Sequence, residues 1–458
     1  MDATRVVIIG GGAAGLAACH TLRKLGIPVL LLEKDDQVGG RLGGDRVAGF
    51  CIDQGADFFC PSYDITFRLC EELGLPLRRS AMNLGWYRNG RWVVTRAGNP
   101  VLASLRGLGA LRALGALSPA GARFLFKLLS GLKRQSEHLN FSSDSRLVEL
   151  DEGESFGEYL DRLGAPDSLR VTLKGFLEMT MGHVEASGAA YMRTYLSEML
   201  LKHSELSVPP QGAGALAHAL AAASGDSIRV STPVRRVLMN RAGQPHSVIT
   251  DDGPIEAVAV ICAVPATRVA GIIPDLHDEV RAALGTVEYS SGCRVVIGLD
   301  HPPLPSGWHG ALYPEDDTPL LLDRSINLPD IAPPGKSTLD LLVGRDRAEQ
   351  LLPLADEEIK RRLLDDARRN RPPGSALPQD HEGIFTRVYR WQEAVCMGPP
   401  GMFRAMARMR RELARDGNGL FLAGDYMGVP SVNGALASGV ASAEQVAARL
   451  QNSGAPLE

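Results

Sequence analysis

At 458 residues the chain is too long for one ordinary core, so two or three structural units are expected. Apolar residues make up 45% and charged residues 22%, which is typical of a folded globular protein and argues against a disordered chain. The formal net charge is -4 and Lys and Arg are scattered, so nucleic acid is not an expected partner.

Cysteine usage and hydropathy indicate the compartment. The seven cysteines include no CxxC pair, which indicates free thiols in a reducing, cytoplasmic environment, with neither a disulfide framework nor a metal site. The start of the chain has an acid at Asp2 and an apolar run of only four residues, so it does not resemble a signal peptide, and the mature chain is expected to begin here. No apolar run approaches the roughly 18 residues of a membrane helix, so no transmembrane segment is expected.

A strand, a glycine turn and a helix are predicted at the start of the chain. The β-branched run at 6–9 leads into Gly10, Gly12 and Gly15, which form a GxGxxG pattern, and 13–25 is rich in Ala and Leu. The first glycine allows a tight turn, the second lets a pyrophosphate approach the backbone, and the third lets the helix pack on the strand. This order predicts a dinucleotide site with its phosphates at the helix start.

An acidic residue follows the second predicted strand, which spans 27–32. Glu33 stands near the spacing at which a carboxylate accepts hydrogen bonds from ribose hydroxyls, and its charge would repel a 2′-phosphate. Ala13 and Ala14 at the helix start and Lys34 beside the acid complete this first group of expected cofactor contacts. A glycine-rich turn without a ligand is the alternative, but the strand, helix and acid together favour the dinucleotide.

Four further segments extend the expected site. Gln-Val-Gly-Gly-Arg at 37–41 and Asp-Gln-Gly-Ala-Asp-Phe at 53–58 follow Glu33 closely. Near the other end, 419–426 is a predicted strand that enters a Gly-Asp turn, and 431–439 opens an Ala-rich helix. The two ends of the chain are therefore expected to build one site.

With these segments the sequence resembles the flavin amine oxidase and protoporphyrinogen oxidase superfamily, at both ends and at several places between. The resemblance implies FAD as cofactor. It also implies an α/β fold, with a Rossmann-like FAD-binding domain of GR2 type and a second, α+β substrate domain. We assign residues 1–79, 206–284 and 391–458 to the FAD-binding domain, and residues 80–205 and 285–390 to the substrate domain.

The resemblance also implies roles for single residues. Gly39, Gly40 and Arg41 would line the pyrophosphate, which suits the forked donors of arginine. In the Gly-Asp turn of Gly424 and Asp425, the acid would hydrogen-bond the ribityl or phosphate region. The other implied contacts are Gly55, Ala56, Asp57 and Phe58, the backbone of Val234 at the adenine, Trp391 beside the isoalloxazine, and Val432 at a helix N-terminus that points at the flavin pyrimidine.

Landmarks between the two ends agree with this resemblance. They are 209–214 before an Ala-rich helix, the 228–237 segment around Val234, and a strand with its proline at 258–265. A second glycine cluster at 212–214 follows two prolines and lacks a third glycine, so it is not expected to bind a nucleotide. A single fingerprint favours oxygen or another small electron acceptor over bound NADPH.

Two departures from the amine oxidase pattern concern the substrate. Ser431 stands where those enzymes usually place an aromatic residue, so half of the aromatic cage for an amine is missing. The segment 288–293 has no counterpart of their flavin-side lysine. Both departures favour the protoporphyrinogen oxidases and related desaturating enzymes. Cys396 lies near the position at which some amine oxidases attach FAD, but its spacing from Pro-Pro-Gly differs, so non-covalent FAD is expected.

The catalytic residues stay open at this level. For Trp391 the alternative is a core aromatic residue, although a flavin-side position is favoured. Weaker candidates are His183, as an acid or base near neutral pH, and Tyr63, Tyr426 and Trp308, as residues that face the substrate.

The substrate half is expected to combine helices with a sheet. Segments 102–132 and 156–201 predict helices, and 294–299 predicts a strand of a sheet above the flavin. The Leu-rich, Arg-dotted run at 102–134 has two interpretations, a helix in peripheral contact with a membrane surface and a helix packed on its own domain. Uneven charge and the lack of an aromatic belt favour the second.

The leading hypothesis is an FAD-dependent oxidase or dehydrogenase that removes two electrons from a C–N or C–C bond of a small organic substrate, with oxygen as acceptor. The alternatives are a non-redox flavin-dependent isomerase or cyclase, and a cofactor-binding scaffold without chemistry. Substrate identity and oligomeric state are left open, because fold-level analogy does not fix function.

Overall fold

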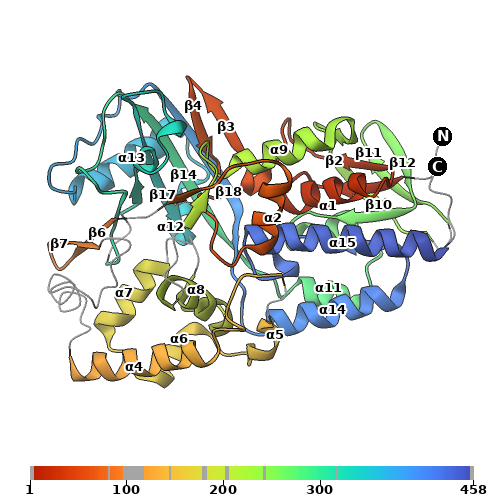
Figure 1. The fold of residues 1–458 in the computed structure, drawn as a ribbon, viewed down its shortest axis with the longest axis horizontal. Coiled ribbons are helices and arrows are strands. Elements are labelled where there is room, and N and C mark those ends of the chain that lie inside the picture. Colours follow the sequence, from red (N-terminus) through yellow and green to blue (C-terminus); the bar gives the residue numbers. More distant parts are fainter. Residues whose placement is uncertain are drawn as a thin grey trace.

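The computed structural model describes residues 5–80, 83–95, 118–143, 146–177, 183–201, 206–240, 244–315 and 318–453. In Figure 1, helices α1 and α15 lie side by side in one half of the molecule, the strands β14, β17 and β18 with helix α13 form the other half, and helices α4, α6, α7 and α8 form a group below. No helix within the described residues is long and apolar enough to cross a membrane.

A five-stranded parallel sheet gathers segments from both ends and the middle of the chain. Its order is β19 (Leu420–Leu422), β13 (Ala259–Cys262), β1 (Val6–Ile9), β2 (Val29–Leu32) and β9 (Ile228–Arg229). The three central strands are almost completely buried, as expected for a parallel sheet covered on both faces. The predicted meeting of the two chain ends is therefore confirmed at the level of the fold.

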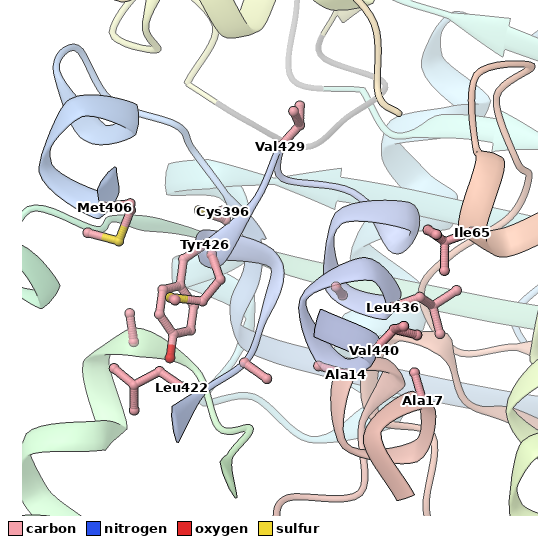
Figure 2. Packing of buried hydrophobic residues seen from close by; sticks show 14 of the residues in the cluster. Ala14, Ala17, Ile65, Cys396, Met406, Leu422, Tyr426, Val429, Leu436 and Val440 are labelled. Atoms are coloured by element: carbon pink, nitrogen blue, oxygen red, sulfur yellow. The ribbon is translucent and has the colours of Figure 1, made fainter. Parts of the chain in front are cut away.

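Helix α1 (Ala13–Lys24) and the long helix α15 (Val432–Ser453) pack closely against each other. Figure 2 shows Ala14 of α1 beside Leu436 of α15, with Ala17 and Val440 nearby. Gly439 makes the approach possible, because a Cβ atom there would lie 2.1 Å from the carbonyl oxygen of Ala14. Small residues at this crossing bring the two helix starts into one region.

A mixed seven-stranded sheet forms the centre of the other half. Its order is β18 (Phe385–Cys396), β14 (Tyr289–Leu299), β17 (Ser337–Gly344), β16 (Leu320–Leu322), β15 (Gly310–Leu312), β6 (Leu84–Arg88) and β7 (Arg91–Thr95). Apolar residues of α12 (Arg345–Leu351) and α13 (Asp356–Arg369) join its core cluster. The strand predicted at 294–299 is confirmed and begins five residues earlier, at Tyr289. Strand β18 runs through 391, so the domain boundary that we propose there falls within a strand.

The helical part of the substrate half contains α4 (Pro119–Arg134), α5 (Leu147–Leu150), α6 (Phe156–Leu163), α7 (Asp167–Leu177) and α8 (Ala189–Leu201). The expected helical character is thus confirmed for the described residues. Residues 102–117 of the Leu-rich segment lie outside them. The remainder of that segment buries Phe124, Leu128 and Leu132 on one face of α4, which supports a helix packed on its own domain.

Shorter elements connect these parts. The strands are β3 (Gly44–Val47), β4 (Phe50–Asp53), β5 (Arg78–Ser80), β8 (Leu206–Val208), β10 (Val234–Leu238), β11 (His246–Thr250) and β12 (Gly253–Ala257). The helices are α2 (Asp64–Glu72), α9 (Gly214–Ser224), α10 (Ala266–Ile272), α11 (Asp278–Leu284) and α14 (Met402–Asp416), with 3-10 turns that include η4 (Arg324–Ile326) and η6 (Asp425–Met427). The predicted helix after the glycine cluster at 212–214 is α9.

Candidate functional site

The glycine turn between β1 and α1 leaves space in front of the helix start. A Cβ atom at Gly15 would lie 1.9 Å from the carbonyl oxygen of Gly10, whereas a Cβ atom at Gly12 would meet no atom within 4 Å. No side chain caps α1, so the N–H groups of Ala13 and Ala14 are not covered by a capping residue. An open backbone at an uncapped helix start suits the phosphates of a dinucleotide.

Glu33 is held at the end of β2 by the glycine turn itself. Its Oε2 atom accepts a hydrogen bond from Gly11 N at 2.6 Å, and its Oε1 atom accepts one from Asp35 N at 3.0 Å. The carboxylate is buried beside the turn and keeps further lone pairs for a ribose hydroxyl. The side chain of Lys34 is 71% exposed and pairs with Asp35 at 2.8 Å, so only its backbone lies beside the acid.

The segment that leads to Val234 lies along the end of β2. Thr232 N donates to the carbonyl oxygen of Glu33 at 2.7 Å, and Ser231 N donates to that of Asp35 at 2.8 Å. Val234 then begins β10 and is half-buried. The structure therefore brings this segment next to Glu33, and the contact between Val234 and an adenine stays a prediction.

Arg41 and Asp425 join the two ends of the chain. Gly39 N donates to the carbonyl oxygen of Gly11 at 2.8 Å, which fixes the Gly-Gly-Arg segment against the glycine turn. The Nη1 atom of Arg41 lies 2.7 Å from Oδ2 of Asp425, and the hydroxyl of Tyr289 donates to Oδ1 at 3.2 Å. Burial and the Asp425 carboxylate raise the pKa of Tyr289 well above its usual range, so this hydroxyl stays protonated.

The 53–58 segment lies between Arg41 and the seven-stranded sheet. Ala56 N donates to the carbonyl oxygen of Arg41 at 2.9 Å, and a Cβ atom at Gly55 would lie 2.5 Å from the same oxygen. The indole N–H of Trp391 donates to the carbonyl oxygen of Gln54 at 3.1 Å. The structure thus brings Trp391 to this segment, as the flavin-side interpretation requires, and Phe58 is half-buried within it.

The carboxylate of Asp57 is directed toward buried arginines of the substrate half. Its Oδ1 atom lies 2.8 Å from Nη1 of Arg294 and 3.2 Å from Nη1 of Arg324. Arg294 also pairs with Asp340, and Arg324 lies 2.5 Å from Oδ2 of Asp53. Asp57 therefore anchors the backbone of its segment, and the side chain is engaged by the protein.

Asp53 occupies the start of α9. Its two carboxylate oxygens accept hydrogen bonds from Ala213 N at 3.0 Å and Gly214 N at 2.8 Å. The N–H groups of the second glycine cluster are therefore satisfied within the protein. This supports the sequence-based exclusion of a second nucleotide site at 212–214.

The start of α15 faces a buried cluster of aromatic side chains. Ser431 caps the helix by accepting from Gly434 N at 2.9 Å, and Val432 is half-buried in the first turn. The hydroxyl of Tyr63 is hydrogen-bonded to Ser431, and that of Tyr191 donates to the carbonyl oxygen of Pro430 at 2.9 Å. The aromatic cluster consists of Phe59, Tyr63, Phe141, Tyr191 and Tyr195, with ring centroids 4.8–6.3 Å apart in the contacting pairs.

Sequence reasoning found only Tyr63 of this cluster. Tyr191 and Tyr195 were missed, although their i, i+4 spacing on a helix places both rings on one face and is a signal that could have been used. Burial raises the pKa of Tyr195 and of Tyr63, so their hydroxyls are neutral hydrogen-bonding groups at physiological pH.

Cys396 and the weaker candidates other than Tyr63 lie away from this region or are packed in the core. Cys396 is fully buried with its Sγ atom 3.9 Å from Sδ of Met402, and burial raises the pKa of its thiol, which supports non-covalent FAD. Tyr426 is completely buried near Cys396, Leu422 and Met406 (Figure 2). Trp308 packs on Trp92 at 5.4 Å, in the core cluster of the seven-stranded sheet. The side chain of His183 is 44% exposed, with Nε2 3.8 Å from Asp346.

One buried carboxyl group near the buried arginines should make the free energy of unfolding depend on pH. Asp323 is fully buried; Oδ1 accepts from Ser325, while Oδ2 has no donor among the described residues. Burial raises the pKa of Asp323 to about 6. Because the folded state then holds this proton more tightly than the unfolded state, the free energy of unfolding falls as the pH rises from about 4 to about 6.

We expect Asp323→Asn to increase the free energy of unfolding at pH 8 by up to about 3 kcal/mol, and by about half as much at pH 5. Urea unfolding at the two pH values measures this difference. Asp251→Asn, at an exposed carboxylate whose pKa is lowered by Arg235, is the control and should bring no such gain. An equal gain for Asp323→Asn at both pH values would contradict the assignment.

Comparisons with known proteins agree with the cofactor site that this geometry indicates. The family model described as flavin containing amine oxidoreductase matches residues 13–447. A putative flavin-containing monoamine oxidase, AofH, of Mycobacterium tuberculosis is 32% identical over 277 residues, which are 58% of this chain and 58% of that protein. The matched part thus spans less than two thirds of that relative. Coproporphyrinogen III oxidase of Bacillus subtilis is 22% identical over 478 residues, covering 93% of this chain and 94% of the relative.

A solved structure shares the fold. The crystal structure of a putative protoporphyrinogen oxidase from Exiguobacterium sp. 255-15 matches with a TM-score of 0.73 and 21% identity, over 98% of this chain and 100% of that chain. The predicted fold class, a Rossmann-like FAD-binding domain with a second, α+β domain, is thereby confirmed.

Proposed function

The chain belongs to the family of flavin-containing amine oxidoreductases, whose cofactor is FAD, and from that membership we propose that it is an FAD-dependent oxidase or dehydrogenase. The reaction that we propose removes two electrons from a C–N or C–C bond of a small organic substrate. Family and relatives are named as oxidoreductases, which gives no support to a non-redox isomerase or cyclase.

One observation carries this proposal, namely that cofactor-binding chemistry from both chain ends converges on one region. The uncapped start of α1 with the open Gly12 fits a pyrophosphate, and Glu33 fits a ribose. Arg41, paired with Asp425 at 2.7 Å, brings the second chain end beside the glycine turn. FAD bound there supplies the two-electron acceptor chemistry, and the protein supplies position and electrostatics.

The residues of the chain have separate tasks in this proposal. The backbone of Ala13 and Ala14 binds phosphate, and Asp57 anchors its own segment through Arg294. The aromatic cluster packs against the start of α15 and excludes water from that side. Tyr63 and Ser431 supply neutral hydroxyl groups there.

Two substrate classes are candidates for this site. The 288–293 segment contains no counterpart of the flavin-side lysine, which favours desaturation of a C–C bond over oxidation of an amine. Tyr289 of this segment is engaged with Asp425. The resemblance to coproporphyrinogen III oxidase over nearly the whole chain favours the same class. Oxidation of an amine is favoured by the 32% identity with AofH.

We propose oxygen as acceptor and a cytoplasmic location. Asp53 accepts the hydrogen bonds of the backbone N–H groups of the glycine cluster at 212–214. The chain therefore offers a single dinucleotide fingerprint, which favours oxygen over a bound NADPH. All seven cysteines are free thiols, consistent with a reducing compartment. Non-covalent FAD is part of the proposal, because Cys396 packs on Met402.

The test begins with an absorption spectrum before and after acid precipitation, where released flavin indicates non-covalent FAD. Anaerobic titration with monoamines, diamines and porphyrinogens should then bleach the flavin band for one class, and admission of air should restore it with formation of hydrogen peroxide. Each two-electron step should remove two hydrogens from the substrate. A flavin that dithionite bleaches but no substrate class does, or a product of unchanged mass, would contradict the proposed oxidation.

A further inference from the structure

A pocket of about 400 Å³ lies among helices α4, α6 and α8, which contact one another in the lower part of Figure 1. Such a volume is sufficient for a small-molecule ligand. Four cationic side chains, one carboxylate and one tyrosine contribute to its lining, namely Lys127, Arg134, Arg162, Arg193, Glu152 and Tyr159. The pocket therefore has an excess of positive charge.

Arg193 is the buried cation of this pocket. The residue is only 8% exposed, and its guanidinium group lies 5.2 Å from the ring centroid of Tyr159. Its Nε atom is buried without a hydrogen-bond acceptor, and no carboxylate lies within ion-pair distance of it in the described part of the chain. Burial lowers the pKa of Arg193, because the charged form has lost its hydration.

Comparable arginines of this protein are paired. Arg88 and Arg294 are the other two arginines buried to this degree among the described residues. Arg88 lies 3.1 Å from Glu315, and Arg294 lies 2.8 Å from Asp57. A buried guanidinium without a counter-charge is costly, and an anionic ligand would remove that cost.

The other cations of the pocket leave the charge excess in place. Arg162 is neutralised by Glu154, with two contacts of 2.7 Å, and stacks on Tyr159 at 5.1 Å. Lys127 donates to the carbonyl oxygen of Leu163 at 3.3 Å and keeps further donors. Arg134 adds a positive charge on the last turn of α4.

The pocket is separate from the candidate flavin site. Arg193 stands between Tyr191 and Tyr195 in α8, and a helix turns by about 100° per residue, so Arg193 points away from the face that carries the two tyrosines. The aromatic cluster and the cationic pocket therefore use opposite faces of the same helix.

We propose that the pocket of α4, α6 and α8 binds a phosphate group, with Arg193 at its floor and Arg134 and Lys127 at its rim. A phosphomonoester carries close to two negative charges at neutral pH, which matches several unpaired cations better than a single carboxylate does. Free phosphorylated small molecules and the headgroups of anionic lipids share this chemistry. Phe126, 73% exposed on the adjacent position of α4, lies next to Lys127.

Isothermal titration of the FAD-loaded protein with inorganic phosphate and glycerol phosphate tests the proposal, at constant ionic strength adjusted with chloride. Saturable binding is expected for the wild type, and binding at least tenfold weaker for Arg193→Met. The matched control is Arg123→Met, at an exposed arginine of α4 outside the lining, which should bind within twofold of the wild type. Should Arg193→Met fail to fold, Arg134→Gln on the rim is expected to weaken binding about threefold.

A thermal measurement separates a ligand site from a structural role for Arg193. Without phosphate, Arg193→Met should melt at the same temperature as the wild type or higher, because an uncompensated charge has been removed. With phosphate, only the wild type should gain stability. A lower melting temperature for the variant, together with equal phosphate affinity, would overturn the proposal.

Vesicles distinguish the two sources of phosphate. Co-sedimentation with phosphatidic acid in phosphatidylcholine, lost in Arg193→Met and absent with phosphatidylcholine alone, assigns the site to a lipid headgroup. Phosphate binding without co-sedimentation assigns it to a soluble ligand. Absence of both overturns the proposal, while the flavin spectrum of the same samples reports separately on the proposed oxidase function.

Discussion

Replacing Arg294 by methionine is expected to lower the melting temperature by about 3–5 °C and to weaken the retention of FAD. Arg294 is 2% exposed and pairs with both Asp57 and Asp340. Its removal leaves the buried Asp340 without its ion-pair partner and leaves Asp57 with Arg324 alone, and breaking a buried ion pair in this way costs about 3–5 kcal/mol. FAD retention should suffer because Asp57 anchors a segment of the expected site.

An exposed arginine provides the matched control. Arg235 contacts Asp251 through two bonds of 2.8 and 2.7 Å, and both side chains are more than half exposed. Arg235→Met should leave the melting temperature almost unchanged, because exposed pairs are screened by water. The double variant Arg294→Met with Asp340→Leu should recover part of the loss, since one stranded carboxylate is gone. Equal losses for Arg294→Met and Arg235→Met would show that burial does not govern the effect.

The part of the fold that could be predicted from sequence is the part with local signals. A buried strand, three spaced glycines, an Ala-rich helix and Glu33 all lie within the first 33 residues, so each step follows from its neighbours in the chain. The Gly-Asp turn before α15 can likewise be predicted from neighbouring residues in the chain. These elements needed no knowledge of distant contacts.

The elements that were missed depend on distant partners. The first residues of β14, Tyr289 to Gly292, are mostly polar or small and have no apolar alternation, but the whole strand pairs with β18 about a hundred residues later. Likewise, nothing beside Asp57 in the sequence identifies Arg294 and Arg324 as its partners. Charge pairing of this kind is decided by the tertiary fold.

The candidate site was also only partly predictable from the sequence, because some of its residues meet only in the folded protein. The spacing of the glycines indicated phosphate binding, because the backbone alone provides that chemistry. The aromatic cluster joins Tyr63 from before α2 with Tyr191 and Tyr195 from α8, and only the fold brings these side chains to Ser431. The cationic pocket was also hidden, because a cation within a helix usually indicates a solvated face.

Gly439→Ala should have the second large effect, and it tests the link between the two chain ends. A Cβ atom at this position of α15 would lie 2.1 Å from the carbonyl oxygen of Ala14, and both groups belong to helix backbones that cannot rotate away. Helices α1 and α15 must therefore move apart, which costs about 1–3 kcal/mol as overpacking. Because the two helix starts carry the expected phosphate and flavin contacts, FAD should be lost on gel filtration.

A second glycine-to-alanine change separates this steric effect from helix propensity. Gly271 lies in α10, and a Cβ atom there would meet no atom within 4 Å, so Gly271→Ala should keep its flavin and melt at the same or a slightly higher temperature. The ratio of flavin to protein absorbance after gel filtration, with the melting temperature, compares the two variants. Full flavin retention by Gly439→Ala would mean that the α1–α15 contact does not set the cofactor site. Flavin loss in that variant alone would instead link cofactor retention to the close approach of the two helices.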